Sequence, residues 1–197
     1  EFAIGTERIS KVKKQQGFTD EIINYVLDSC GLTLDDIDCV ATNDFKQELF
    51  GNDYLVDNFV IQGKELKCYI IPHHLAHCAS VFYTSPFHEA HCFSMDCSMG
   101  KLEANSLVAY GKGKNLTAMY CPGEMVGVLY GEVTEKLGLG PALHKAGTTM
   151  GLSSYGTPFD FDYQSYTDDI KHKMNVAASV QNLFENRVLN VLDDINQ

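Results

Sequence analysis

The middle of the chain constrains the fold most, because its hydrophobic pattern changes from strand type to helix type and back. A short apolar run at 67–71 is typical of a strand and stops at Pro72, which cannot donate to a strand ladder. The segment 73–83 then has helical composition and ends before Ser85-Pro86. Further apolar runs of strand type follow at 91–96, 106–110 and 116–120. This order predicts one helix followed by three antiparallel strands, and therefore a mixed α/β fold.

The first third of the chain carries a clear helix signal and a weaker strand signal. A helix is predicted to begin at the Thr19 cap and to end at Gly31. A short apolar run at 38–42 predicts a strand. The interval from Asn43 to Gly63 is polar and poorly periodic, so no regular element is predicted there.

The last third is predicted to be helical. A helix is expected over 124–137, where Gly127 and Gly131 lie one turn apart, a spacing that suits close packing against a sheet. An amphipathic helix is expected from Val176 onward. A chain of 197 residues is long enough for one domain, or at most two small ones. We expect a single domain with a leading segment (1–18), a core (19–157), a linker (158–175) and a C-terminal helix (176–197).

The composition argues against several classes of partner. The chain has 15 Lys and Arg against 26 Asp and Glu, a formal net charge of −11, so a nucleic-acid or anionic-membrane surface is not expected. No apolar stretch approaches the roughly 20 residues that span a bilayer, and the N-terminus has no signal-peptide pattern. The seven cysteines include no Cys-x-x-Cys pair and are interpreted as reduced core thiols. These features favour a cytoplasmic protein.

Two histidines on the predicted central helix form a candidate metal site. His73 and His77 are four residues apart, so both rings can reach one cation, and imidazoles suit zinc or iron. Asp96, at the end of a predicted buried strand, is the natural third ligand. Taken alone, a His-x-x-x-His pair more often marks helix-cap or core histidines; in that reading His74 faces solvent.

Several blocks of the sequence resemble one family. The run from Ile71 to Phe87 is similar, nearly letter for letter, to the signature "HHLAHAASAFYTSPF" of the NodU/CmcH-type carbamoyltransferases. The C-terminal helix resembles the "ARSVQ" helix of the same family. Three further blocks agree in order: 6–13 with "EERFSRxKH", where Lys14 replaces the usual His; 93–100 with "LTVDGVGE", where Cys97 replaces the first Gly; and 147–156 with "GKVMGLAPYG".

The resemblance implies both a fold and a chemistry. The fold would be one lobe of an actin-like ATPase (ribonuclease-H-like) domain, related to tRNA threonylcarbamoyl transferases and to the hydrogenase maturation factor HypF. In that family, ATP and carbamoyl phosphate form carbamoyladenylate in a YrdC-like domain. A metal in the actin-like domain then helps to move the carbamoyl group to a hydroxyl of a small-molecule acceptor. The resemblance therefore implies a divalent metal, iron or zinc, and ATP or carbamoyladenylate as cofactors.

The resemblance also assigns roles to particular residues. His73, His77 and Asp96 match metal ligands. For two segments with implied contacts a structural role is also open. The segment 147–151 could be a loop that leads into a helix and is packed by Met150 and Leu152, and the segment 7–13 could be solvated surface. Nucleotide or substrate contacts are implied for Ser98, Gly100, Lys145, Gly147, Gly151, Glu7, Arg8 and Lys13.

The departures from the family pattern limit what this chain is expected to do alone. The family's second lobe, with a further aspartate ligand and a nucleotide-binding glycine loop, would begin where this sequence stops. We therefore expect the isolated chain to be inactive, and an exposed lobe face to favour a homodimer. One alternative is a non-catalytic metal-binding or protein-interaction module with the same fold. A second is a relative that acts on tRNA, which the charge of −11 disfavours.

Overall fold

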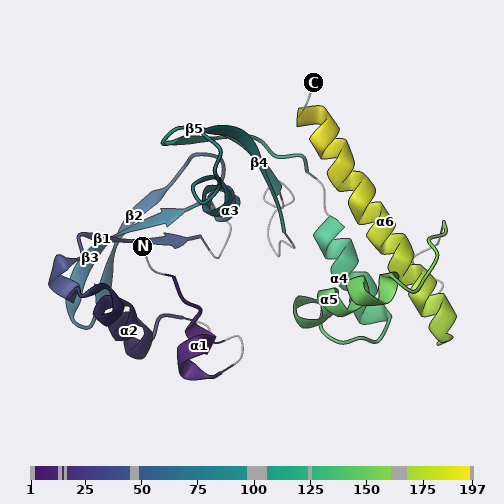
Figure 1. Cartoon of the computed structure of the whole chain (residues 1–197), viewed down its shortest axis with the longest axis horizontal. Helices are drawn as coiled ribbons and strands as arrows, with labels where there is room; N and C mark the ends of the chain where they lie inside the picture. The colour runs from purple at the N-terminus through teal and green to yellow at the C-terminus, as the bar shows by residue number, and fades with distance from the viewer. Residues whose placement is uncertain are drawn as a thin grey trace. The chain divides into compact units, whose positions relative to one another are not determined.

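The computed structural model describes residues 3–12, 15, 17–44, 49–96, 106–123, 126–160 and 168–195. The chain forms two units, and Figure 1 shows the elements of each. The first unit comprises Glu1–Asn43 and Tyr54–Ile71, and the second comprises Asp44–Asp53 and Pro72–Gln197. Both helices and strands occur in the described residues, which confirms the mixed α/β class.

The first unit begins with helices. Helix α2 starts where the side chain of Thr19 accepts a hydrogen bond from the backbone N–H of Ile22, and it ends at Gly31, whose φ is 66°. Both ends confirm the prediction. The helical elements of this unit are α1 (Thr6–Ser10), α2 (Asp20–Cys30) and the 3-10 turn η1 (Leu34–Asp36).

The sheet of the first unit has three strands in the order β1-β3-β2. Strand β1 (Cys39–Asn43) runs parallel to β3 (Lys64–Ile71), and β2 (Leu55–Ile61) runs antiparallel to β3. The β2–β3 turn places Gln62 and Gly63 at φ 49° and 83°, both positive as in two-residue turns of type I′. The predicted β1 and β3 are confirmed, whereas β2 lies in the interval where no element was predicted.

The second unit contains a helix packed on an antiparallel sheet. Helix α3 (His73–Phe82) is followed by β4 (Glu89–Met95), β5 (Ser106–Lys112) and β6 (Asn115–Tyr120), in the sheet order β4-β5-β6. The predicted helix and three antiparallel strands are thus confirmed. The apolar cluster between helix and sheet consists of Cys78, Phe82, Cys92, Leu107 and Ala109.

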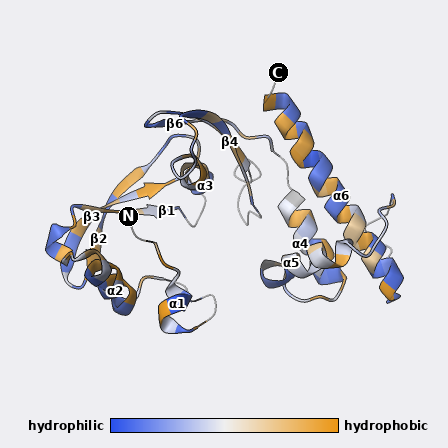
Figure 2. Cartoon of the chain, in the orientation of Figure 1, coloured by the Kyte–Doolittle hydropathy of each residue, from blue (hydrophilic) through white to orange (hydrophobic). Residues whose placement is uncertain are grey.

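Among the described residues of this unit, three helices follow the sheet: α4 (Val126–Lys136), α5 (Ala142–Ser153) and α6 (Ile170–Ile195). Figure 2 shows polar and apolar residues alternating along α6, as expected of an amphipathic helix. No helix in the described ranges is both long enough and apolar enough to cross a membrane. The core of the three helices consists of Tyr130, Val133, Leu137, Val176, Ala177 and Val180.

Three predictions in this region were wrong. Gly131 allows α4 to approach Ala142 of α5, so the small residue serves contact between helices rather than contact with a sheet. The predicted loop at 147–151 is helical, and Met150 is 58% exposed rather than packed. The tertiary environment buries Thr149 completely and overrides the weak helix propensity of two glycines.

The boundary of the last helix also needs correction. The predicted linker at 158–175 contains the first turns of α6, which begins at Ile170. The side chain of Asp169 accepts a hydrogen bond from the backbone N–H of His172 at 2.9 Å, as an N-cap residue does. The Asp-rich composition concealed a capping signal that lies before the amphipathic pattern.

Candidate metal centre

Three potential ligand atoms meet where α3 begins and β4 ends. Pro72 precedes the helix, so His73 is its first residue and His77 lies one turn later on the same side. Asp96 is the first residue after β4. The distance from His73 Nε2 to Asp96 Oδ2 is 3.1 Å, from His77 Nε2 to the same oxygen 3.5 Å, and between the two Nε2 atoms 3.1 Å.

A shared cation explains this triangle more simply than hydrogen bonding does. An imidazole nitrogen carries either a hydrogen or a lone pair, and an ionised carboxylate only accepts. His73 Nε2 must donate in order to bond Asp96, and it can bond His77 as well only by sharing the same hydrogen between two acceptors. If all three lone pairs point at one cation, each short contact is explained at once. The residues present therefore fit a divalent metal.

The spacing of the three atoms suits the same interpretation. Ligands about 2.1 Å from a tetrahedral ion lie about 3.4 Å from one another. The observed separations of 3.1–3.5 Å bracket that value. The side chain of His73 is 17% exposed, that of Asp96 44% and that of His77 48%, so the centre is open on one side. An open side leaves room for ligands from outside these three residues.

The neighbouring histidine differs from expectation. His74 is only 6% exposed, and its Nδ1 lies 2.8 Å from the hydroxyl oxygen of Ser94 on β4, so the reading in which His74 faces solvent was wrong. Asp96, by contrast, is better solvated than its place after a buried strand suggested. The adjacency of two histidines at a helix start was the available signal that one of them is inward, but no pattern identified Ser94 as its partner.

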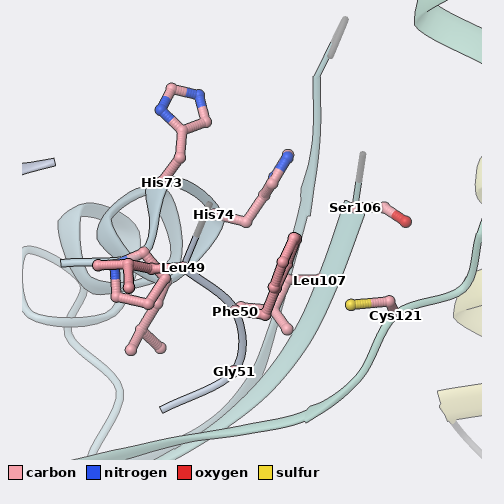
Figure 3. A pocket seen from close by; sticks show the side chains of 10 residues that line it. Leu49, Phe50, Gly51, His73, His74, Ser106, Leu107 and Cys121 are labelled. Carbon is pink, nitrogen blue, oxygen red and sulfur yellow. The ribbon is translucent and has the colours of Figure 1, made fainter. Parts of the chain in front are cut away.

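A small cavity lies behind the first turn of α3, on the side where His74 is buried. Its volume is about 20 Å³, room for about one water molecule. Figure 3 shows the rings of His73 and His74 leaving this turn in different directions. The cavity lining therefore includes one candidate ligand but does not extend the centre into a substrate-sized pocket. The residues that line it are Leu49, Phe50, Gly51, Pro72, His73, His74, Leu75, Ser106, Leu107 and Cys121.

The other predicted contact residues are not brought to this centre by any described interaction. Lys145, Gly147 and Gly151 lie on α5. Glu7 and Arg8 are exposed on α1 of the first unit. Ser98, Gly100 and Lys13 lie outside the described residues. Their roles in nucleotide or substrate binding remain predictions.

Comparison with known proteins finds a matching family and a similar curated protein. The model of the family described as "Carbamoyltransferase N-terminus" matches residues 41–191. The chain is also similar to the nodulation protein NolNO of Sinorhizobium fredii (strain NBRC 101917 / NGR234), with 28% identity over 182 residues. That alignment covers 79% of this chain and 26% of NolNO, so the chain spans about a quarter of the length of this relative.

Proposed function

Because the chain belongs to the carbamoyltransferase N-terminus family, we propose that it is the metal-binding part of an ATP-dependent O-carbamoyltransferase. The observation that carries this proposal is the cluster of His73, His77 and Asp96, with ligand atoms 3.1–3.5 Å apart. The donor would be carbamoyladenylate, formed from carbamoyl phosphate and ATP in a YrdC-like domain. The acceptor would be a hydroxyl group of a small molecule.

The reaction defines what the centre has to do. The acceptor oxygen forms a bond to the carbamoyl carbon, the bond from that carbon to the AMP phosphate oxygen breaks, and the hydroxyl proton passes to a base. A bound iron or zinc ion would supply a positive charge that polarises a carbonyl or holds a phosphate oxygen. His73 and His77 would bind that ion as neutral imidazoles, and Asp96 would add one negative charge. Because the side of the centre near His77 is open, donor and acceptor can approach from there.

We propose carbamoyl transfer for an enzyme that also contains the second lobe and the YrdC-like domain. The chain spans about a quarter of NolNO, and we expect these 197 residues alone not to transfer carbamoyl groups. We also propose a cytoplasmic location, which agrees with the absence of a disulfide among the cysteines in the described ranges. The net charge of −11 supports a small-molecule acceptor over tRNA.

Metal analysis tests the proposal directly. The purified chain is loaded with Zn²⁺ or, without oxygen, with Fe²⁺, and retained metal is measured after gel filtration. We expect close to one ion per chain, lost in the His73→Ala/His77→Ala variant. The matched control is His88→Ala/His91→Ala, which removes two histidines at the other end of the same sheet and is expected to keep the ion. Equal retention by both variants would refute the assigned centre.

A second candidate is an interaction module that retains the metal but has no catalytic role. The exposed apolar side chains of β2 favour it, because an edge strand of this kind is a ready surface for another chain. A homodimer formed through such a face would appear in gel filtration as a mass that doubles with concentration. This candidate would be favoured if the chain binds one metal ion and adding the family's second lobe and YrdC-like domain produces no ATP-dependent carbamoyl transfer. The side chains concerned are Leu55, Val56, Phe59 and Val60 of β2 and Tyr54 just before it.

A further inference from the structure

We propose that the hydrogen bond between His74 and Ser94 is a positioning device that sets the spacing of the metal ligands. The inference rests on the proposed function, because it concerns the centre formed by His73, His77 and Asp96. Neither His74 nor Ser94 belongs to the ligand cluster. Both act through their neighbours.

The bond is short and buried. Nδ1 of His74 and Oγ of Ser94 lie 2.8 Å apart, and the residues are 6% and 8% exposed. A hydrogen bond shielded from water is directional, and breaking it leaves a buried polar group whose desolvation is uncompensated. The pair therefore holds the two backbone segments at one separation more firmly than apolar contact alone would.

The two residues stand beside the ligands in sequence. His74 directly follows His73 in the first turn of α3, and Ser94 lies two residues before Asp96. Alternate residues of a strand point to the same side, so Ser94 and Asp96 both lie toward α3. A bond from His74 to Ser94 thus fixes the start of the helix against the end of the strand, where the 3.1 Å contact between His73 and Asp96 occurs.

Ring packing adds a second constraint. The rings of His73 and His74 lie edge to face, with centroids 5.3 Å apart and planes at 88°. The rings of His73 and His77 repeat this arrangement at 4.6 Å. A His74 ring held by Ser94 therefore limits the rotation of His73, whose ring in turn contacts that of His77.

The rest of the helix is held differently. Cys78 and Phe82 anchor the second half of α3 in the core cluster, where Cys78 Sγ, a weak donor, lies 4.0 Å from the carbonyl oxygen of Leu107, at the limit of hydrogen bonding, and the other contacts are apolar. Such contacts are non-directional and tolerate small displacements along the helix axis. The first turn, which carries His73, obtains a directional contact from His74.

The test compares two single-atom deletions on the same strand. Ser94→Ala removes the hydroxyl oxygen, and Cys92→Ala removes a buried sulfur two residues earlier. Binding of Co²⁺ to the full 197-residue chain is followed by its visible absorption, and stability by urea unfolding. We expect Ser94→Ala to weaken Co²⁺ binding about tenfold, the lower end of the effect of residues that support metal ligands. Cys92→Ala should leave Co²⁺ binding unchanged even where it lowers stability as much.

A second pair of variants guards against loss of folding. His74→Asn keeps a hydrogen-bonding group near the position of Nδ1 and should retain more Co²⁺ affinity than His74→Ala. A purely structural role predicts that affinity follows stability across all four variants, and that result would overturn the inference.

A metal-free readout separates this inference from the proposed function. If the wild-type chain binds no Co²⁺, the proposed metal centre fails, and the nitrogen and ring-proton resonances of His73 decide the positioning role. We expect Ser94→Ala to shift them and Cys92→Ala not to do so. Unchanged His73 resonances in Ser94→Ala would overturn the positioning role whether or not metal binds.

Discussion

The ring of Phe82 lies so close to Gly111 that a Cβ added to Gly111 would be 2.6 Å from three ring carbons. Phe82 is 3% exposed and belongs to the cluster between α3 and its sheet, so it has little space to move. We expect Gly111→Ala to lower the free energy of unfolding by about 1–3 kcal/mol through overpacking. Urea unfolding followed by circular dichroism measures the change.

Gly147→Ala is the matched control for this substitution. Gly147 lies within helix α5, and a Cβ there would meet nothing within 4 Å. Because alanine is the better helix former, the free energy of unfolding of the variant should rise by up to about 1 kcal/mol. A loss of stability at Gly147 equal to that at Gly111 would contradict the interpretation that the Phe82 contact matters.

A pair of buried hydroxyl groups predicts which of two threonine substitutions destabilises the chain more. The hydroxyl of Thr134 donates to the carbonyl oxygen of Tyr130, so the hydroxyl of Thr149, 2.8 Å away, donates to Thr134. Both threonines are fully buried. Thr134→Val leaves the hydroxyl of Thr149 without its acceptor. We expect it to lower the free energy of unfolding by about 1–3 kcal/mol, more than Thr149→Val does. The double variant should be more stable than Thr134→Val, and additive losses in urea unfolding would refute this.

Thiol reactivity should separate the cysteines into two classes. Burial raises the pKa of Cys78 to about 12 and also raises that of Cys92, whereas Cys30 and Cys39 are exposed. Since the thiolate is the nucleophile, Cys78 at pH 8 is reactive in only about one molecule in 10⁴. In a Cys97→Ser/Cys121→Ser background, Cys30 and Cys39 should react with a disulfide reagent within minutes. The buried Cys68, Cys78 and Cys92 should react only after urea is added. Fast labelling of Cys78 in the native chain would contradict the packing of α3.

Metal should stabilise the unit that contains the centre. Zn²⁺ at about 100 times its dissociation constant would raise the free energy of unfolding by about 2.7 kcal/mol, because it binds the folded state in preference to the unfolded chain. The melting temperature should rise by several degrees and return to its starting value with a chelator. Asp96→Asn should remove most of the rise, while Asp57→Asn on the exposed strand β2 should leave it intact.

The parts of the fold that could be predicted are those in which the local pattern and the tertiary environment agree. Helix α2 has its capping residue and its terminal glycine in sequence, and α3 follows a proline directly. Strand β2 escaped prediction because almost every residue in it is exposed, so no face alternates between polar and apolar. Helix α5 contains Gly147 and Gly151, and only its packing against α4 and α6 makes it helical.

The sequence allowed the prediction that His73, His77 and Asp96 lie together, but not the prediction of the contact that supports them. The spacing of His73 and His77 indicates a shared face on any helix, and Asp96 follows a recognisable strand. The inward orientation of His74 depends on its partner Ser94, twenty residues away, and a pairing of that kind leaves no periodic trace. Long-range hydrogen bonds between single residues were therefore beyond the reach of the sequence.

The order of elements in the second unit also bears on how the chain reaches its native state. Helix α3 contacts β4 and β5, β5 contacts β6, and α4, α5 and α6 contact one another, so most partners are close neighbours in sequence. Contacts between elements that follow one another closely in sequence can form early in folding. During synthesis from the N-terminus, the helix and sheet that bring His73 near Asp96 can close before α6 has left the ribosome. The candidate ligands would thus be assembled early, and the helices that follow would fold after the site is already in place.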